Sequence, residues 1–79
     1  MSALAYEIRL RELRERAKRA TEHAGKLGGY LQAKLDEGAE PAWYMVREFE
    51  RRHDAMITAL AEVAAAEAET ADDLEQDGR

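Results

Sequence analysis

Apolar side chains recur along the first half of this chain at alternating steps of three and four residues. This spacing gathers them on one stripe of an α-helix, because an α-helix completes a turn about every 3.6 residues. The positions are Ala3, Tyr6, Leu10, Leu13, Ala17, Ala20, Ala24, Leu27 and Leu31. The pattern predicts an amphipathic first helix over about residues 3–37, with Ser2 as a plausible cap.

A second stripe with the same spacing follows after a short interruption. Its members are Val46, Phe49, His53, Met56, Leu60 and Val63, and it is widened by Trp43, Met45, Ile57 and Ala64. Gly38 offers the left-handed residue at which many helices end, and Pro41 suits the first position of a new helix. We therefore expect a turn over 38–40 and a second helix over about 41–70, followed by a fraying acidic tail over 71–79.

The short turn and the distribution of charge both predict that the helices lie antiparallel. Residues 9–19 hold six basic residues against two acidic ones, whereas residues 62–77 hold seven acidic residues and no basic one. Folding the chain about Ala39 brings these blocks together, and it sets alanines of one helix opposite bulky residues of the other. The expected fold is therefore all-α, a single antiparallel two-helix hairpin of the coiled-coil kind.

The predicted first helix contains three glycines, Gly25, Gly28 and Gly29. Each costs about 1 kcal/mol relative to alanine in a helix interior, which argues against a smooth helix. The apolar stripe nevertheless stays in phase across them, from Ala24 to Leu31. This continuity predicts a first helix that is unbroken or at most kinked.

A lone hairpin buries one line of contact, but the second helix carries apolar residues over a wider arc than one line requires. A domain of 79 residues also hides only about 60% of its unfolded surface, so a partner would stabilise it. Pairing two hairpins into a four-helix bundle is the simplest solution, and we expect a homodimer. The residues expected in the hairpin and dimer seam are Leu10, Leu13, Ala17, Ala20, Ala24, Leu27, Leu31, Phe49, His53, Met56 and Leu60.

The inventory of reactive side chains points away from catalysis. Absence of cysteine excludes disulfides, thiolate metal sites and cysteine nucleophiles. The only serine is Ser2, and the spacing places no histidine and carboxylate pair beside any threonine. We expect no enzymatic activity and no cofactor. The chain has neither a secretory leader nor an apolar run of about 18 residues, so the expectation is a cytoplasmic protein without membrane contact.

The segment Glu50-Arg51-Arg52-His53 resembles the Glu-x-x-His step of ferritin-like di-iron proteins, including the short encapsulin-associated ferritins. The resemblance implies a metal site shared between the helices of two paired hairpins. Its natural further ligand, Glu22, falls on the outer face of the first helix, two positions from both Ala20 and Ala24. We therefore favour His53 as a seam residue, with metal binding as an alternative.

The basic run from Arg9 to Arg19 suggests a second alternative, a nucleic-acid-binding regulator, because such clusters neutralise phosphates. The run contains two glutamates and no aromatic residue, and the chain as a whole carries a net charge of −5. An acidic segment of matching length lies on the same chain. These features favour a solvated or salt-bridged face over contact with nucleic acid.

Aromatic residues concentrate around the predicted turn, where Tyr30, Trp43 and Tyr44 come together. Trp43 and Tyr44 are adjacent and so point in different directions, which means that one neighbouring helix cannot bury both. Tryptophan and tyrosine commonly anchor interfaces. The expected function is therefore a non-enzymatic interaction module, a small helical adaptor or regulator that docks on a larger protein through these three residues.

Overall fold

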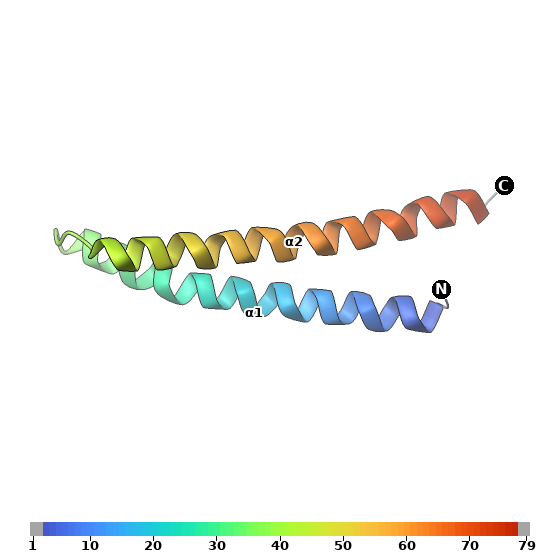
Figure 1. Ribbon diagram of the computed structural model, residues 1–79, viewed down its shortest axis with the longest axis horizontal. Coiled ribbons are helices and arrows are strands. Elements are labelled where there is room, and N and C mark those ends of the chain that lie inside the picture. The colour runs from blue at the N-terminus through green and yellow to red at the C-terminus, as the bar shows by residue number, and fades with distance from the viewer. Residues whose placement is uncertain (1–2, 78–79) are drawn as a thin grey trace.

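The computed structural model describes the backbone of residues 3–77 and the side chains of residues 3–69. Two helices, α1 (Ala3–Asp36) and α2 (Trp43–Asp77), run antiparallel and form a rod of 60 × 20 × 17 Å (Figure 1). The turn lies at one end of the rod, and the first and last described residues lie at the other. This arrangement confirms the predicted all-α two-helix hairpin.

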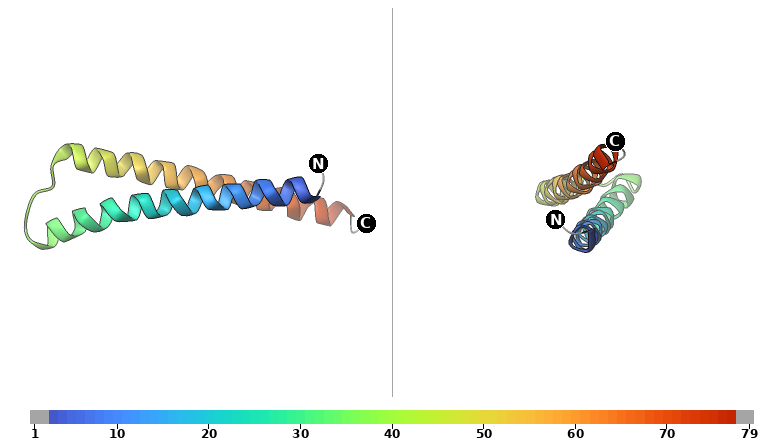
Figure 2. Two further views of the ribbon diagram at one scale, coloured as in Figure 1. Left: turned by 90° about the horizontal axis from the view of Figure 1, so that it is seen from below. Right: turned by 90° about the vertical axis from the view of Figure 1, so that its right-hand side faces the viewer.

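The two helices twist about each other along the rod. In Figure 1 they overlap near the turn and lie side by side at the far end. In the view from below in Figure 2 they lie apart near the turn and overlap at the far end. Such winding is what a sustained spacing of three and four apolar residues produces, because it keeps both stripes facing each other.

The end of α1 is a glycine-terminated cap. Gly38 has a φ of 82°, in the left-handed region that favours glycine. Its N–H donates to the Leu35 carbonyl at 3.0 Å, and the Ala39 N–H donates to the Lys34 carbonyl at 3.0 Å. This pair of bonds satisfies carbonyl groups that the helix end leaves free. Gly38 therefore has the role that the sequence predicts for it.

The start of α2 differs from the sequence expectation by two residues. The Ala42 carbonyl accepts the Val46 N–H at 3.2 Å, so the helix begins at Trp43 and Pro41 lies before it. Residues 37–42 must cross the space between the helices, and a residue that precedes proline favours extended backbone. The connection is thus longer than the turn predicted over 38–40.

Both helices are continuous over their full described length. α1 passes through Gly25, Gly28 and Gly29 without interruption, as an unbroken stripe predicts. At Gly28 a Cβ atom would lie 3.0 Å from Cε2 of Phe49, so this glycine allows the ring to approach the α1 backbone closely. The α2 backbone stays helical through Asp77, beyond the predicted end at residue 70. The side chains of the expected acidic tail lie outside the described residues.

The seam between the helices is narrow. Among the described residues, the buried ones are Ala17, Ala24, Leu31, Ala59 and Ala66, so four of the five are alanines. The other predicted α1 positions from Tyr6 to Leu27 are half-buried between the helices. The Tyr6 hydroxyl donates to the Ala66 carbonyl at 2.5 Å and ties the open end of the hairpin together.

On α2 the seam of the single hairpin contains a different set of residues from the predicted one. The buried and half-buried α2 positions at alternating steps are Met45, Phe49, Arg52, Met56, Ala59, Val63 and Ala66. His53 and Leu60, which the sequence places in the seam, are exposed within the hairpin, Leu60 by 45%. The physical reason is size, because alanines at 59 and 66 let α2 approach the alanines of α1 more closely than leucine would.

Candidate interaction surfaces

One face of the hairpin carries two shallow hollows between α1 and α2 that share Thr21, and together we call them the interhelical groove. Its half near the turn is lined by Thr21, Ala24, Gly25, Gly28, Gly29, Phe49, His53 and Met56. Its half toward the open end is lined by Arg14, Ala17, Lys18, Thr21, Glu22, Leu60, Val63 and Glu67. The two halves meet at Thr21, so the groove follows the long axis of the rod.

The half of the groove near the turn is apolar and shallow. The ring of Phe49 forms one wall and contacts the ring of His53, with 5.9 Å between the ring centroids. Opposite them the groove floor is made by glycines and by Thr21, whose hydroxyl is already bonded to the Ala17 carbonyl at 2.8 Å. Such a surface can receive a packed side chain or a helix, and the charged groove-lining residues all lie in the other half.

The apolar surface of α2 continues past the edge of the groove. Ile57 is 50% exposed, Leu60 is 45% exposed and Trp43 is 71% exposed. His53, Ile57 and Leu60 lie at steps of four and three residues along α2, and Trp43 lies two heptads before Ile57, so these residues share one side of the helix. This second stripe lies beside the seam stripe and has no covering element among the described residues.

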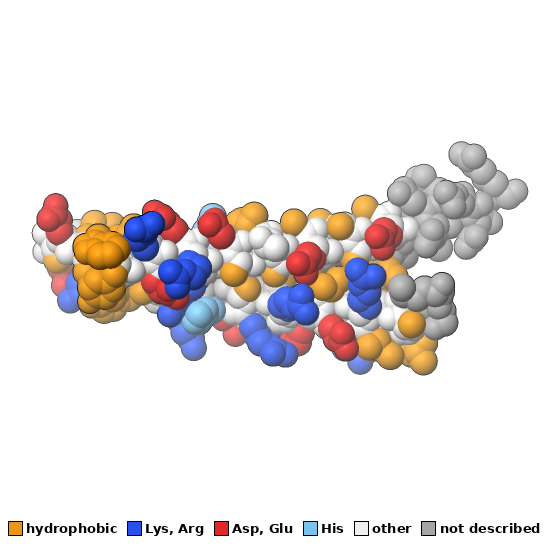
Figure 3. Space-filling model, in the orientation of Figure 1, with side chains coloured by type: hydrophobic (Ala, Val, Ile, Leu, Met, Phe, Trp, Pro, Cys, Tyr) orange, Lys and Arg blue, Asp and Glu red, His pale blue; other side chains and the backbone are white. Residues whose placement is uncertain are grey.

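The turn end carries the three aromatic residues that the sequence singled out, Tyr30, Trp43 and Tyr44, which we call the aromatic apex. The rings of Trp43 and Tyr44 meet edge to face with centroids 6.4 Å apart. The Arg47 guanidinium lies 6.0 Å from the Trp43 ring centroid, and the Lys34 ammonium lies 5.6 Å from that of Tyr30. Trp43 and Tyr44 are largely exposed, Tyr30 is 46% exposed, and Figure 3 shows hydrophobic side chains gathered at this end.

Charge pairs join the basic start of α1 to the acidic part of α2, as the charge blocks predict. Arg14 contacts Glu67 at 3.3 Å, and Arg16 contacts Glu62 at 3.4 Å. The two pairs lie on opposite sides of the seam. Arg14 and Glu67 line the groove, whereas Arg16 lies with residues of the outer surface of α1. Partial neutralisation within the chain favours a salt-bridged face over phosphate binding by the basic run.

The ion pair beside the groove should contribute little to stability. Arg14 and Glu67 keep 58% and 51% of their side-chain surface exposed, and exposed pairs typically contribute less than about 1 kcal/mol. We expect Glu67→Gln to lower the free energy of unfolding by less than about 1 kcal/mol in a denaturant titration, and the difference should shrink in high salt. Glu69→Gln is the matched control. A loss above about 2 kcal/mol would show that the pair is far better shielded than its exposure indicates.

Arg52 is a seam residue that the sequence analysis missed. Its side chain is 25% exposed, its Nε donates to Glu48 at 3.2 Å, and one terminal nitrogen donates to the His23 carbonyl of α1 at 3.1 Å. Its position lies one heptad before Ala59, and this spacing could have placed it in the seam. The charge argued against it, but a long arginine can bury its stem while its guanidinium reaches polar partners.

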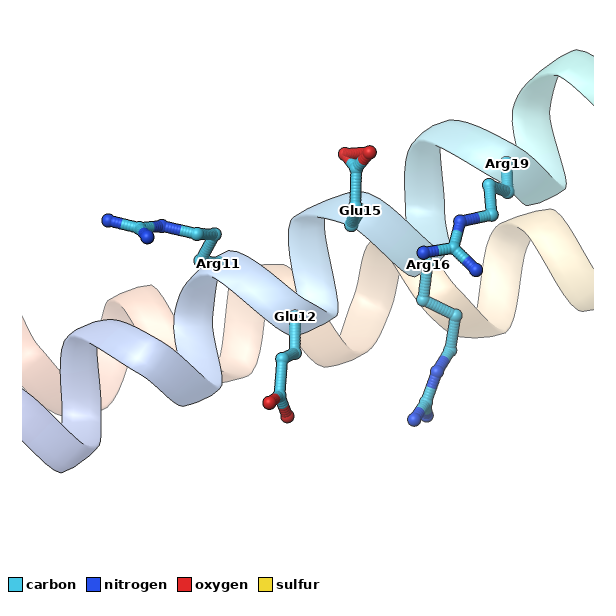
Figure 4. Close-up of a pocket in the computed structure, with 5 residues that line it drawn as sticks. All are labelled: Arg11, Glu12, Glu15, Arg16 and Arg19. Atoms are coloured by element: carbon cyan, nitrogen blue, oxygen red, sulfur yellow. The ribbon is translucent and has the colours of Figure 1, made fainter.

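A further hollow lies along the outer surface of α1 and is lined by Arg11, Glu12, Glu15, Arg16 and Arg19. Figure 4 shows that these side chains come from one helix and spread apart, with Glu15 and Glu12 pointing in opposite directions. Because they do not converge, they form no shared binding point for one ligand. The hollow is therefore a charged helix surface.

The candidate metal residues are not gathered into a site. The described part of the chain contains no group of three or more His, Cys, Asp or Glu side chains that could hold a metal ion. Glu50 and His53 are both exposed on α2. Glu22 lies at the groove and not on the outer face that the sequence predicts, but it lines the other half of the groove from His53. This separation favours a packing role for His53.

Neither described helix is long and apolar enough to cross a membrane. Comparisons with protein-family models, with curated proteins and with solved structures found no match to this chain. The exposed surfaces of the hairpin are therefore the features that indicate a function.

Proposed function

We propose that this protein is a non-enzymatic helical interaction module. In this proposal two hairpins pair through their groove faces into a four-helix bundle, and the aromatic apex docks on a larger protein. The seam of one hairpin holds the chain in shape, and the remaining apolar surfaces serve binding.

The observation that carries the proposal is the amount of surface that one chain leaves exposed. The hairpin exposes 6305 Å². A compact monomeric protein of 8.9 kDa exposes about 4,800 Å², so this chain exposes about 1,500 Å² more. Stable homodimer interfaces bury comparable areas from each partner. The apolar groove and the uncovered α2 stripe are the natural place for this burial.

Sedimentation equilibrium of the purified full chain tests the pairing. We expect a mass of about twice 8.9 kDa at micromolar concentration, because a wide apolar interface favours the dimer. A single species of monomer mass across the accessible concentrations would overturn the four-helix bundle.

The aromatic apex is proposed as the docking site because it combines exposed rings with flanking cations. Trp43 is 71% exposed and Tyr44 is 63% exposed, and both lie clear of the seam. Large aromatic side chains contribute strongly when an interface covers them. Arg47 and Lys34 beside the rings would favour a partner surface with acidic groups next to an apolar pocket.

Trp43→Ala should weaken docking and leave the hairpin folded. Because the Trp43 side chain is 71% exposed, we expect unchanged helical content by circular dichroism. We also expect a loss of at least about tenfold in affinity for a protein that co-purifies from native extract. Thr58→Ala, an exposed change elsewhere on α2, is the control. Equal recovery of the same protein by the parent, Trp43→Ala and the control would remove Trp43 from the docking site.

A further inference from the structure

The groove face presents two unlike stripes, one from each helix. The α1 stripe is small over its central part, where Thr21, Gly25 and Gly28 line the groove. The α2 stripe is bulky, because His53 and Leu60 line the groove and Ile57 continues it outward. A bulky stripe packs best against a small one, so each stripe is complementary to the other and not to itself.

The glycines of α1 show that the single hairpin does not account for this small stripe. At Gly28 the close approach of Phe49 explains the missing side chain. At Gly25 and Gly29, however, an added Cβ would meet nothing within 4 Å. Each glycine costs the helix about 1 kcal/mol relative to alanine, and no contact within one chain offsets this cost. A second backbone or a bulky side chain that approaches closely at these positions would offset it.

Charge selects which helix of a second copy approaches α1. The groove side of α1 carries Arg14 and Lys18 toward the open end of the rod, and α2 carries Glu67 at the same end. If the α2 of a second copy lies antiparallel on α1, its acidic end meets this basic region. If α1 lay in parallel against its own copy, the basic regions would repel each other.

We propose that two copies pair side by side, with the two-fold axis along the rod and each α1 seated against α2 of the partner. This inference depends on the proposed dimer and specifies its arrangement. All four neighbouring helix pairs are then antiparallel, and every basic α1 start lies between two acidic α2 ends. Both turns lie at one end of the bundle, so a docking protein meets two copies of the aromatic apex together.

Cysteine cross-linking tests the arrangement, because the chain has no native cysteine. Two singly substituted chains, Lys18→Cys and Ala64→Cys, are mixed, unfolded, refolded together and treated with a short bismaleimide. Within one chain Arg14 meets Glu67 on the groove side, so α1 and α2 positions near this level should also face each other across the dimer. We expect a covalent product of twice the chain mass that contains one copy of each variant.

The opposite pairing, in which α1 lies antiparallel against its own copy, predicts a different product. Lys18→Cys would then cross-link to Gln32→Cys chains and not to Ala64→Cys chains. That outcome would overturn the side-by-side arrangement and leave the dimer intact. A monomer mass in sedimentation equilibrium would instead overturn the dimer itself, so the two failures are distinguishable.

A substitution at the small stripe gives an independent measurement. Gly25→Leu should raise the dimer dissociation constant by about tenfold or more, because it fills the space that the partner helix would occupy. Glu15→Leu, on the outer surface of α1, is the matched control and should leave the constant unchanged. An unchanged constant for Gly25→Leu would overturn the close approach at α1.

Discussion

Leu31→Asp is expected to unfold the hairpin. Leu31 is 7% exposed and is the only buried side chain larger than alanine among the described residues. The change removes apolar burial and leaves a carboxylate in the seam without a partner, at a cost of about 3–5 kcal/mol. Because small domains have little stability to lose, we expect loss of most of the helical signal in far-UV circular dichroism at room temperature.

Ala33→Asp is the matched control for this experiment. It adds the same charge two residues away, at an exposed position of α1, and it lowers helix propensity by a similar amount. We expect this variant to remain folded with a free energy of unfolding within about 1 kcal/mol of the parent. If both variants melt like the parent, Leu31 does not lie in a seam that excludes water.

Leu60→Glu is expected to separate the proposed dimer. Within one chain Leu60 is 45% exposed at the rim of the groove, so the hairpin itself can accommodate a charge there. In the paired bundle the same side chain would be covered, and an unpaired carboxylate would cost several kcal/mol at each of two symmetric positions. We expect the variant to sediment as a monomer under conditions in which the parent is a dimer.

Ala61→Glu serves as the control, because it adds the same charge at an exposed position next to the groove-lining leucine. It should remain dimeric. A Leu60→Glu chain that sediments and melts like the parent would show that the groove face is not the interface. If Leu60→Glu instead loses its helical signal at a temperature at which the parent is folded, the hairpin depends on its partner for stability.

Much of the hairpin follows from local patterns in the sequence. The steps of three and four fix the α1 stripe, and the structure places Ala17, Ala24 and Leu31 at its buried positions. Gly38 ends α1 because a left-handed residue is needed there, and the short connection after it requires the antiparallel direction, with which the basic and acidic blocks agree. These features depend on residues close in sequence or on blocks of charge, and both can be recognised in the sequence alone.

The start of α2 was not predicted correctly, because proline is suited to the first helical position but does not require it. The deciding contact is the Ala42 carbonyl accepting the Val46 N–H, which leaves Pro41 in the connection. How many residues the connection needs depends on the distance between the helices. At the turn end the seam positions that lie between the helices are Leu31, Met45 and Phe49.

The sequence by itself determined that two amphipathic helices fold back on each other, since periodicity, the glycine cap and charge are properties of the chain. Only the tertiary structure decided how α2 is rotated about its own axis. The positions 49, 56 and 63 belong to both possible stripes, which differ in whether Arg52 and Ala59 or His53 and Leu60 complete them. Packing decided between them, because α2 approaches α1 more closely through Ala59 than through Leu60, and this leaves the bulkier stripe facing outward.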